Sequence, residues 1–401
     1  MSFLSDPINF IAHWLQTLLL GLGISVTASS LILTFVGAAI LATSGLVFVI
    51  FLIWYERKIA GRFQDRFGPN RVGPWGIIQP VADMLKIFTK EYITPVGADR
   101  FLYNLAPILN VASVLFAWAI IPFTITVFGS NLNVGVLYFV AVGALGELGI
   151  ILAGWSSNNK YALLGAFRVI AQLISYEVPM VLALLVPVML SQSMDLTNIV
   201  KAQQPWFIVT APLAALIFFI CSIAEAGRAP FDLMEAESEI VAGYNIEYSG
   251  LKFGMFFVGE FLHTFTLAIL FATLFLGGWQ GPGVAQFPIL GIIYLVIKTF
   301  VVYFATLVLR FSVPRFRIDQ MMAINWKLLT PLSLAVVVVT AIMVKLLANT
   351  ALIPFTLILL AANFLLAVIT LELMRRWASR ARKQEAQLQA IPNLPHKSVS
   401  A

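Results

Sequence analysis

Six carboxylates lie close together in one short segment of the sequence, between two long apolar segments. The segment, EAGRAPFDLMEAESEIVAGYNIEYSG (225–250), holds six of the chain's 19 acidic residues: Glu225, Asp232, Glu235, Glu237, Glu239 and Glu247. Its one basic residue is Arg228, so the carboxylates must be hydrated, pair with distant cations or hold protons at raised pKa values. Interacting carboxylates titrate together, and the pattern therefore predicts a coupled acidic cluster.

Two structures of this segment are compatible with its composition. A helix from about Phe231 would place Asp232, Glu235 and Glu239 on one face, three and four residues apart, with Glu237 pointing elsewhere. The alternative is a solvated loop whose glutamates keep a membrane protein soluble. Apolar residues alternate with the acids where a solvated loop would favour serine, asparagine and lysine, and this favours the acidic cluster.

Other ionisable residues lie inside apolar stretches. They are Glu147, Glu177 (in ISYEVP), Glu260 and Lys298. Charges at such depth in a membrane usually face the interior of a helix bundle, where they pair or conduct protons. A structural salt bridge of Lys298 with Glu147 or Glu177 is the alternative to proton conduction.

Composition identifies the class of protein. The chain of 401 residues is 60% hydrophobic and 11% charged, with a mean hydropathy of +0.93. These values exclude a soluble globular protein and predict a polytopic membrane protein. The single Cys221 rules out a disulfide within the chain and a cysteine-ligated iron-sulfur cluster. The three histidines are far apart, and no metal site is expected.

Apolar runs predict an all-α fold with about nine transmembrane helices in one domain, residues 1–380, after an interfacial helix at the N-terminus. The expected spans are 30–54, 107–127, 135–155, 165–190, 206–224, 251–276, 288–310, 329–347 and 352–374. Residues 381–401 are polar and basic with no apolar period, and we expect them to form a cytoplasmic tail.

Successive loops of the chain alternate between many basic residues and few. One side of the predicted membrane holds most of them, in the loop from Arg57 to Arg100 and in the later loops near Lys160, Arg228 and Arg315. By the positive-inside rule this side is cytoplasmic, so the N-terminus lies outside and nine spans place the C-terminus in the cytoplasm. The predicted location is the cytoplasmic membrane.

The first cytoplasmic loop contains a short amphipathic segment. After the turn GPNRVGP, apolar residues recur at helical spacing from Trp75 to Phe88, opposite polar residues that include Asp83. This predicts a helix in the plane of the interface, beside the boundary residues Glu56 and Arg57. Such a helix next to a membrane-embedded cavity suits the entrance of a lipid-soluble substrate.

Six stretches of the chain are similar to one family. YERKIAGRFQDRFGPNRVGP, QPVADMLKIFTKE, LAGWSSNNKYALLGAFR, ISYEVP, RAPFDLMEAESEIVAGYNIEYSG and PRFRIDQMM resemble the quinone-site membrane subunit (the H subunit) of bacterial respiratory complex I, the proton-pumping NADH:quinone oxidoreductase. The resemblance runs from about Tyr55 to Leu332. The last predicted span and the basic tail go beyond the family's shortest members.

The resemblance implies a translocase subunit without a redox centre of its own. Its substrate would be a quinone, ubiquinone or menaquinone. FMN and the iron-sulfur clusters would belong to partner subunits of the hydrophilic arm, and small and antiporter-like membrane subunits would be neighbours. The chain would also contact membrane lipid but no nucleic acid. By motif match, the quinone chamber would involve Arg57, Asp83, Arg228, Asp232, Arg310 and Arg315. The proton path would run through Glu235, Glu237, Glu239, Glu247, Glu177, Glu147 and Glu56, with Glu56 at the junction of the two.

Three other classes of protein remain as alternatives. The homologous membrane anchor subunit of a membrane-bound hydrogenase or related dehydrogenase is disfavoured by the EAESE run and the intact GPNRVGP loop. An ion transporter should show an inverted repeat, and the acidic segment has no counterpart in the other half of the chain. A structural scaffold leaves the buried acids unexplained.

Overall fold

The computed structural model describes residues 6–233, 237–347 and 351–389, and within them the chain is helical with no β-strand. The α-helices are α1 (Pro7–Gly21), α2 (Val26–Phe63), α3 (Gln79–Thr89), α4 (Arg100–Trp118), α5 (Gly135–Ser156), α6 (Lys160–Ser191), α7 (Leu196–Ala202), α8 (Phe207–Thr210), α9 (Pro212–Glu225), α10 (Glu237–Ile240), α11 (Gly250–Phe275), α12 (Ile289–Ser312), α13 (Ile318–Ile324), α14 (Thr330–Leu346) and α15 (Leu352–Gln389). Short 3-10 turns form at Pro74–Gly76 and Gly243–Asn245, and a π turn at Asn325–Leu329 joins α13 to α14.

Eight of the described helices are long and apolar enough to cross a membrane, which confirms a polytopic all-α protein. The expected span 206–224 differs from these eight. It is divided into the one-turn α8 and the 14-residue α9, because Pro212 follows the non-helical Ala211. The expected span 107–127 was placed too far along the chain. Helix α4 begins at Arg100, where Asp99 caps it, and ends at Trp118, before the extended residues around Pro122.

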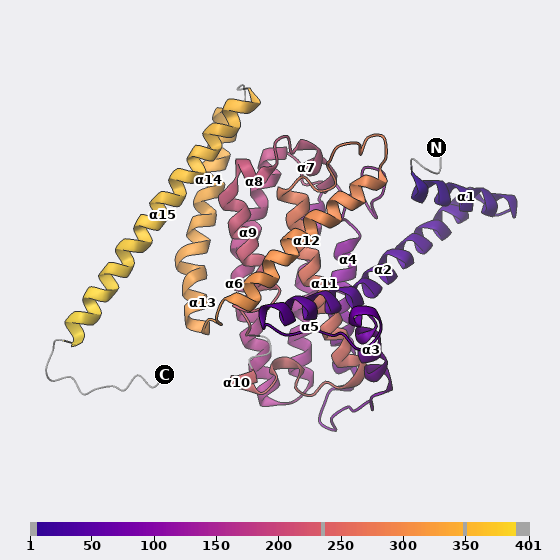
Figure 1. Cartoon of the computed structure of the whole chain (residues 1–401), viewed down its shortest axis with the longest axis horizontal. Coiled ribbons are helices and arrows are strands. Elements are labelled where there is room, and N and C mark those ends of the chain that lie inside the picture. The colour runs from indigo at the N-terminus through magenta and orange to yellow at the C-terminus, as the bar shows by residue number, and fades with distance from the viewer. Residues whose placement is uncertain (1–5, 234–236, 348–350, 390–401) are drawn as a thin grey trace.

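Helix α11 lies at the centre of the bundle and is the most buried of the eight. It packs against α4 and α12 and contacts α2, α3 and α9, while α4, α5 and α6 pack in sequence beside it (Figure 1). Threonine hydroxyls within α11 donate to carbonyls of the preceding turn, so these polar groups are satisfied inside an apolar core. Helix α11 can therefore be buried together with its threonines.

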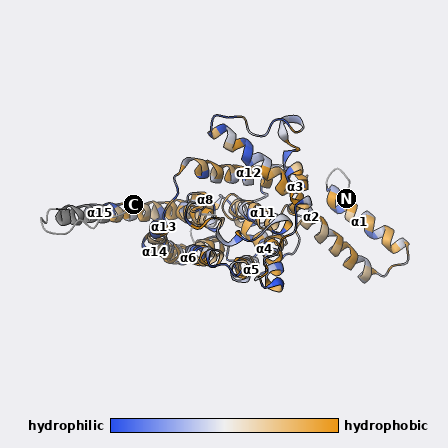
Figure 2. Ribbon diagram, turned by 90° about the horizontal axis from the view of Figure 1, so that it is seen from below, coloured by the Kyte–Doolittle hydropathy of each residue, from blue (hydrophilic) through white to orange (hydrophobic). Residues whose placement is uncertain are grey.

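The two ends of the bundle differ. Figure 1 places α3, α10 and α13 at one end and α7 and α8 at the other, as the alternation of basic loops requires. The interfacial helix predicted for Trp75–Phe88 forms as α3, starting at Gln79, and Trp54 Nε1 donates to the carbonyl of Trp75 at 3.1 Å. Figure 2 shows apolar residues along α2 and α12.

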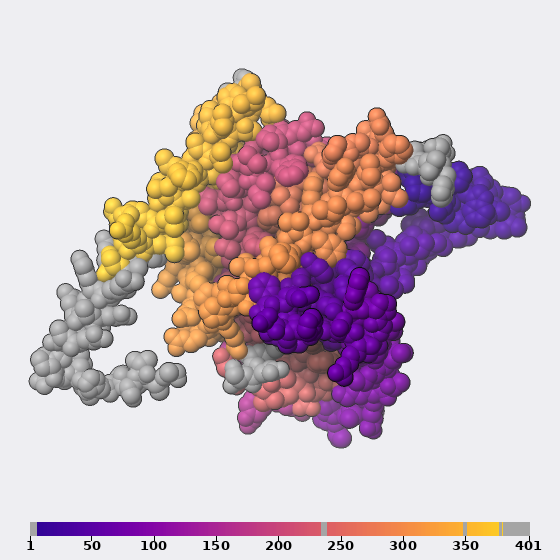
Figure 3. Space-filling view, in the orientation of Figure 1, coloured from indigo at the N-terminus to yellow at the C-terminus, as the bar shows by residue number. Residues whose placement is uncertain are grey.

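Helix α15 leaves the bundle and continues past the point where the sequence predicted a tail. It contacts α8, α9 and α14 and then diverges from them (Figures 1 and 3). The segment expected as a polar tail from residue 381 is helical as far as Gln389, because alanine, arginine, glutamate and glutamine are strong helix formers that need no apolar face. An ion pair between Glu372 and Arg376 at 2.9 Å stabilises α15 where its sequence changes from apolar to polar. Residues 390–401 lie outside the described part of the chain.

Candidate functional site

A buried ion network joins three helices and the turn after α9. Arg228 donates through one guanidinium nitrogen to both carboxylate oxygens of Glu56, at 3.0 and 3.1 Å, and its Nε lies 2.8 Å from Glu260 Oε1. Arg310 from α12 also pairs with Glu56, and the hydroxyl of Tyr303 lies 3.5 Å from Glu56 Oε2. Glu56 and Arg228 are buried, so their charges need this mutual compensation.

The turn that delivers Arg228 depends on a glycine. Gly227 has φ of +62°, in the left-handed region, and ends α9 so that the next side chain turns back into the bundle. The guanidinium then lies over the ring of Phe261, 4.4 Å from its centroid. This cation–π contact adds to the two ion pairs in holding the cation.

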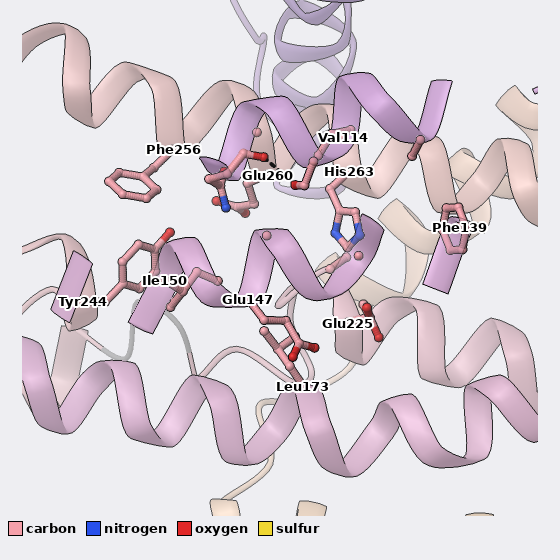
Figure 4. A pocket seen from close by; sticks show the side chains of 17 residues that line it. Val114, Phe139, Glu147, Ile150, Leu173, Glu225, Tyr244, Phe256, Glu260 and His263 are labelled. Carbon is pink, nitrogen blue, oxygen red and sulfur yellow. Dashed lines mark hydrogen bonds between the residues drawn. The ribbon is translucent and has the colours of Figure 1, made fainter. Parts of the chain in front are cut away.

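A cavity of about 50 Å³ lies beside this network, between α4, α5, α9 and α11. Figure 4 shows Glu147 and Glu225 pointing into it from two helices, with Glu260 and His263 on the opposite wall. Asn110 and Ser113 also line it. A water molecule needs about 10–15 Å³ measured in this way, so the cavity has room for a few waters between the carboxylates. Glu260 links the cavity to the ion network because it also pairs with Arg228.

Two groups in the cavity have polar atoms that the described residues leave without hydrogen bonds. They are Glu225 Oε2 and Asn110 Oδ1, and both atoms are buried. Helix α11 can approach α4 here because Gly259 has no side chain, and a Cβ at that position would collide with Asn110 Oδ1. Buried polar atoms normally find a partner, so these two favour water or an exchangeable proton inside the cavity.

Glu177 lies near this cavity without lining it. Its carboxylate is half-buried on α6, within electrostatic range of Glu147 and Glu225. The alternative of a salt bridge from Lys298 to Glu147 or Glu177 does not form in the described chain. Lys298 Nζ instead donates to the carbonyls of Gly278 and Gln280, each at 2.9 Å.

Among its described residues the acidic segment is mostly irregular, and the helix from Phe231, one of its two possible structures, does not begin there. Asp232 lies in a loop, because the backbone carbonyls of the two residues before it accept hydrogen bonds from residues far away in the sequence. Phe316 N–H donates to Pro230 O at 3.0 Å, and Gln172 Nε2 donates to Phe231 O at 2.8 Å. Between the end of α9 and the start of α11, α10 is the only α-helix among the described residues, so no helical face shared by Asp232 and Glu239 is seen. Glu235 lies outside the described residues, and Glu237 is described only as part of α10.

Glu239, on α10, forms ion pairs with two arginines. It pairs with Arg168 from α6, and Arg315 lies 3.2 Å away. The hydrogen bond from Arg168, with the charges of both arginines, lowers the pKa of Glu239 below its usual value in spite of partial burial. Glu239 is therefore ionised at neutral pH.

Glu247 and Asp83 occupy two further positions at the same end of the molecule. Asn159 Nδ2 donates to Glu247 Oε1 at 2.6 Å, beside an open cleft. Asp83 of α3 pairs with Arg57 of α2. Burial would raise the pKa of Asp83, but the hydrogen bond and charge of Arg57 outweigh it and lower that pKa. This pair ties the interfacial helix to the first span.

The structure divides the predicted site residues into separate groups. Glu56, Arg228 and Arg310 meet in the ion network, and Glu239 meets Arg315 nearer the end of the bundle. Arg57 and Asp83 form a third pair. The cation Arg168 and the cavity residues Glu225 and His263 were not among the predicted site residues. For Glu225 a signal was present, since it directly follows an apolar run, as a residue facing a bundle interior would.

The site contains groups that bind and release protons. Carboxylates from different helices surround a space large enough for water, and a fixed array of arginines lies next to them. No group of three or more histidine, cysteine, aspartate or glutamate residues suited to a metal ion occurs within 6–233, 237–347 and 351–389.

The known proteins that are similar to this chain are subunits of the same kind of enzyme. Residues 36–341 match the family described as NADH dehydrogenase. The chain is 47% identical over 296 residues to the H subunit of the NADH-quinone oxidoreductase of Dehalococcoides mccartyi strain CBDB1, covering 74% of this chain and 82% of that protein. It is also 47% identical over 305 residues to an H subunit of the NADH-quinone oxidoreductase of Geobacter metallireducens, at 74% and 91% coverage. For the corresponding H subunit of Vesicomyosocius okutanii the identity is 42% over 332 residues, at 80% and 93% coverage.

Proposed function

The chain belongs to the NADH dehydrogenase family, as an H subunit of the membrane enzyme NADH-quinone oxidoreductase, and we propose that within this multi-subunit enzyme it couples quinone reduction to proton translocation. The observation that supports this most strongly is that the buried ion network and the cavity share one carboxylate. Glu56, Arg228 and Glu260 form one ion network, and Glu260 also lines the cavity that contains Glu147 and Glu225.

The quinone side of the proposal lies at the end of the bundle that carries α3 and α10. The arginines Arg57, Arg228, Arg310 and Arg315, with Asp83 and Asp232, border the membrane side of the quinone chamber. Partner subunits of the hydrophilic arm complete the chamber and hold the FMN and iron-sulfur clusters. The exposed apolar residues of α3, including Met84, Leu85 and Phe88, border the entrance through which a quinone leaves the lipid.

The proton side runs inward from that end. Reduction of a quinone to its dianion creates negative charge and a demand for protons. The pKa values of nearby carboxylates change in response, because these groups interact with one another. Changes of protonation then pass toward neighbouring antiporter-like subunits along Glu239, Glu247, Glu56, Glu177 and Glu147. Glu235 and Glu237 belong to this path by their position in the sequence. The N-terminus lies outside and the end with α3 and α10 faces the cytoplasm.

The substitution Glu147→Gln tests this proposal. The amide keeps the size and polarity of the side chain but takes up no proton at neutral pH. In the intact complex, reconstituted into vesicles, we expect fewer protons translocated per NADH and a lower rate of quinone reduction. Glu372→Gln, which removes an exposed carboxylate on α15, is the matched control. Proton translocation by Glu147→Gln equal to that of the control would contradict the proposal.

A further inference from the structure

Lys252 is a buried cation in a place that disfavours positive charge. Only 5% of its surface is exposed, and it lies two residues after the start of α11, where the helix dipole is positive. Within the described residues it has no carboxylate at ion-pair distance, and its Nζ donates to Thr94 Oγ1 at 3.4 Å. A lysine is expensive to bury in this way, so its surroundings must compensate the charge.

Aromatic rings provide that compensation. The Nζ lies 4.3 Å from the centroid of Tyr92 and 4.2 Å from that of Tyr103. Tyr103 stacks on Tyr248 with centroids 4.1 Å apart and planes within 3°, and the edge of Phe256 packs on Tyr248 at 4.9 Å. Lysine and aromatic faces attract each other most strongly where water is excluded. Tyr103, Tyr248 and Phe256 are buried and Tyr92 is 59% exposed, so Lys252 lies between one solvent-facing ring and a buried layer of three rings.

The rings of this layer contact the linings of two spaces. On one side is the open cleft of about 480 Å³ lined by Glu247, Asn159 and Lys160. On the other side is the cavity of the carboxylates, which Phe256 lines together with Tyr244. The stacked rings belong to a compact apolar cluster that also contains Tyr244 and Phe256.

The tyrosine hydroxyls in the layer do not form a chain for protons. Tyr103 donates to the backbone carbonyl of Glu247 at 2.7 Å, and Tyr248 donates to the backbone carbonyl of Tyr103 at 3.2 Å. Burial raises the pKa of Tyr248 to about 12, against a smaller opposing effect of its hydrogen bond with Ser156, so this hydroxyl keeps its proton at neutral pH. Peptide carbonyls are poor proton carriers, and the layer offers no relay of acids and bases.

We propose that Lys252 determines the side from which the carboxylate cavity receives protons. Its fixed charge and the positive end of α11 repel hydrated protons, as fixed cations and helix ends do in pores that exclude cations. The rings exclude water from the same layer. Protons then reach the cavity through the ion network of Glu56 and Glu260, and those taken up at Glu247 must follow that route because they do not cross the ring layer directly. This inference rests on the proposed function, because such a barrier matters only if the cavity conducts protons.

The test compares Lys252→Met with Lys252→Arg in the complete enzyme reconstituted into vesicles. The methionine keeps the bulk but removes the charge, whereas arginine keeps the charge and also binds aromatic faces. We expect Lys252→Met to reduce quinone at a rate within about twofold of the unsubstituted enzyme but to lose translocated protons per NADH. Lys252→Arg and the control Lys345→Met, at an exposed lysine of α14, should keep the full number.

Each other outcome is decisive. An unchanged number of protons per NADH in Lys252→Met overturns the barrier, while a loss in Glu147→Gln at the same time would leave the proposed function intact. Lys252→Gln is a second neutral variant if the methionine variant assembles poorly. If neither neutral variant assembles but Lys252→Arg does, the cation is needed only for folding, and the barrier is equally overturned.

Discussion

Glu56 compensates two arginines, and this makes it the most sensitive single carboxylate of the ion network. Glu56→Gln leaves Arg228 and Arg310 without their shared counter-charge in a buried site. Breaking a buried pair from one side typically costs about 3–5 kcal/mol, so we expect poor assembly of the enzyme and a lower melting temperature. Quantification of assembled complex in membranes checks this. Asp83→Asn removes one partner of the half-exposed Arg57 and should cost much less.

Glu239 gives a pH dependence with a defined sign. Its pKa is lowered in the folded chain, mainly by Arg168, so the stability that its ion pairs contribute is fully present above the pKa of an unfolded glutamate. That contribution is lost as the pH falls through the lowered value. The melting temperature of Glu239→Gln should therefore lie below that of the unsubstituted enzyme by a constant amount between about pH 6 and 8.

The difference should shrink only below about pH 4.3, the ordinary pKa of glutamate. Because the Glu239 side chain is 45% exposed, the difference should be small. Thermal scans at one fixed heating rate measure it. A difference that already changes between about pH 8 and 6 would show that Glu239 titrates near neutrality, against the proposed ion pairing.

At the residue scale, the sequence could not predict which distant residues pair with one another. The number and depth of the acids predicted functional carboxylates, but Arg168 and Arg315 are 71 and 76 positions from Glu239. No local pattern encodes such a pairing. The cavity beside Glu225 could not be predicted for a similar reason, since its lining residues come from helices that are far apart in the sequence.

At the scale of elements, periodic helices were predictable and their boundaries were less so. Long apolar runs predicted α5, α6, α11 and α12 to within a few residues at each end. The acidic segment failed as a helix because tertiary hydrogen bonds from Gln172 and Phe316 take the carbonyls that a helix would use. Local spacing cannot foresee that competition.

Helix α3 allows a test of the quinone entrance. Met84→Trp adds bulk to the exposed apolar face of α3 while leaving the Arg57–Asp83 pair in place. We expect a higher KM for long-tailed quinones, with NADH oxidation by a water-soluble acceptor unchanged. Val96→Trp, at a fully exposed position beyond α3, is the control for added bulk. Equal loss of both activities in Met84→Trp would indicate an assembly defect and not an obstructed entrance.

At the scale of the whole molecule, the ionisable groups inside the bundle come from many helices. The ion network, the cavity and the Glu239 pairs involve α2, α4, α5, α6, α9, α10, α11 and α12, and the described part of α15 contributes to none of them. Helix α15 also begins beyond residue 341, where the family match ends. We therefore assign the coupling to the bundle as far as α14.

The most direct test of proton coupling is whether Glu147 and Glu225 act as one unit. Both carboxylates face the same small cavity, and members of a coupled titration should give non-additive effects. The measurement is the number of protons translocated per NADH by the reconstituted enzyme carrying Glu147→Gln, Glu225→Gln or both, at matched complex content. Coupling through the cavity predicts that each single change lowers this number and that the double change lowers it little further. Proton translocation equal to that of the unsubstituted enzyme in all three variants would contradict the central claim.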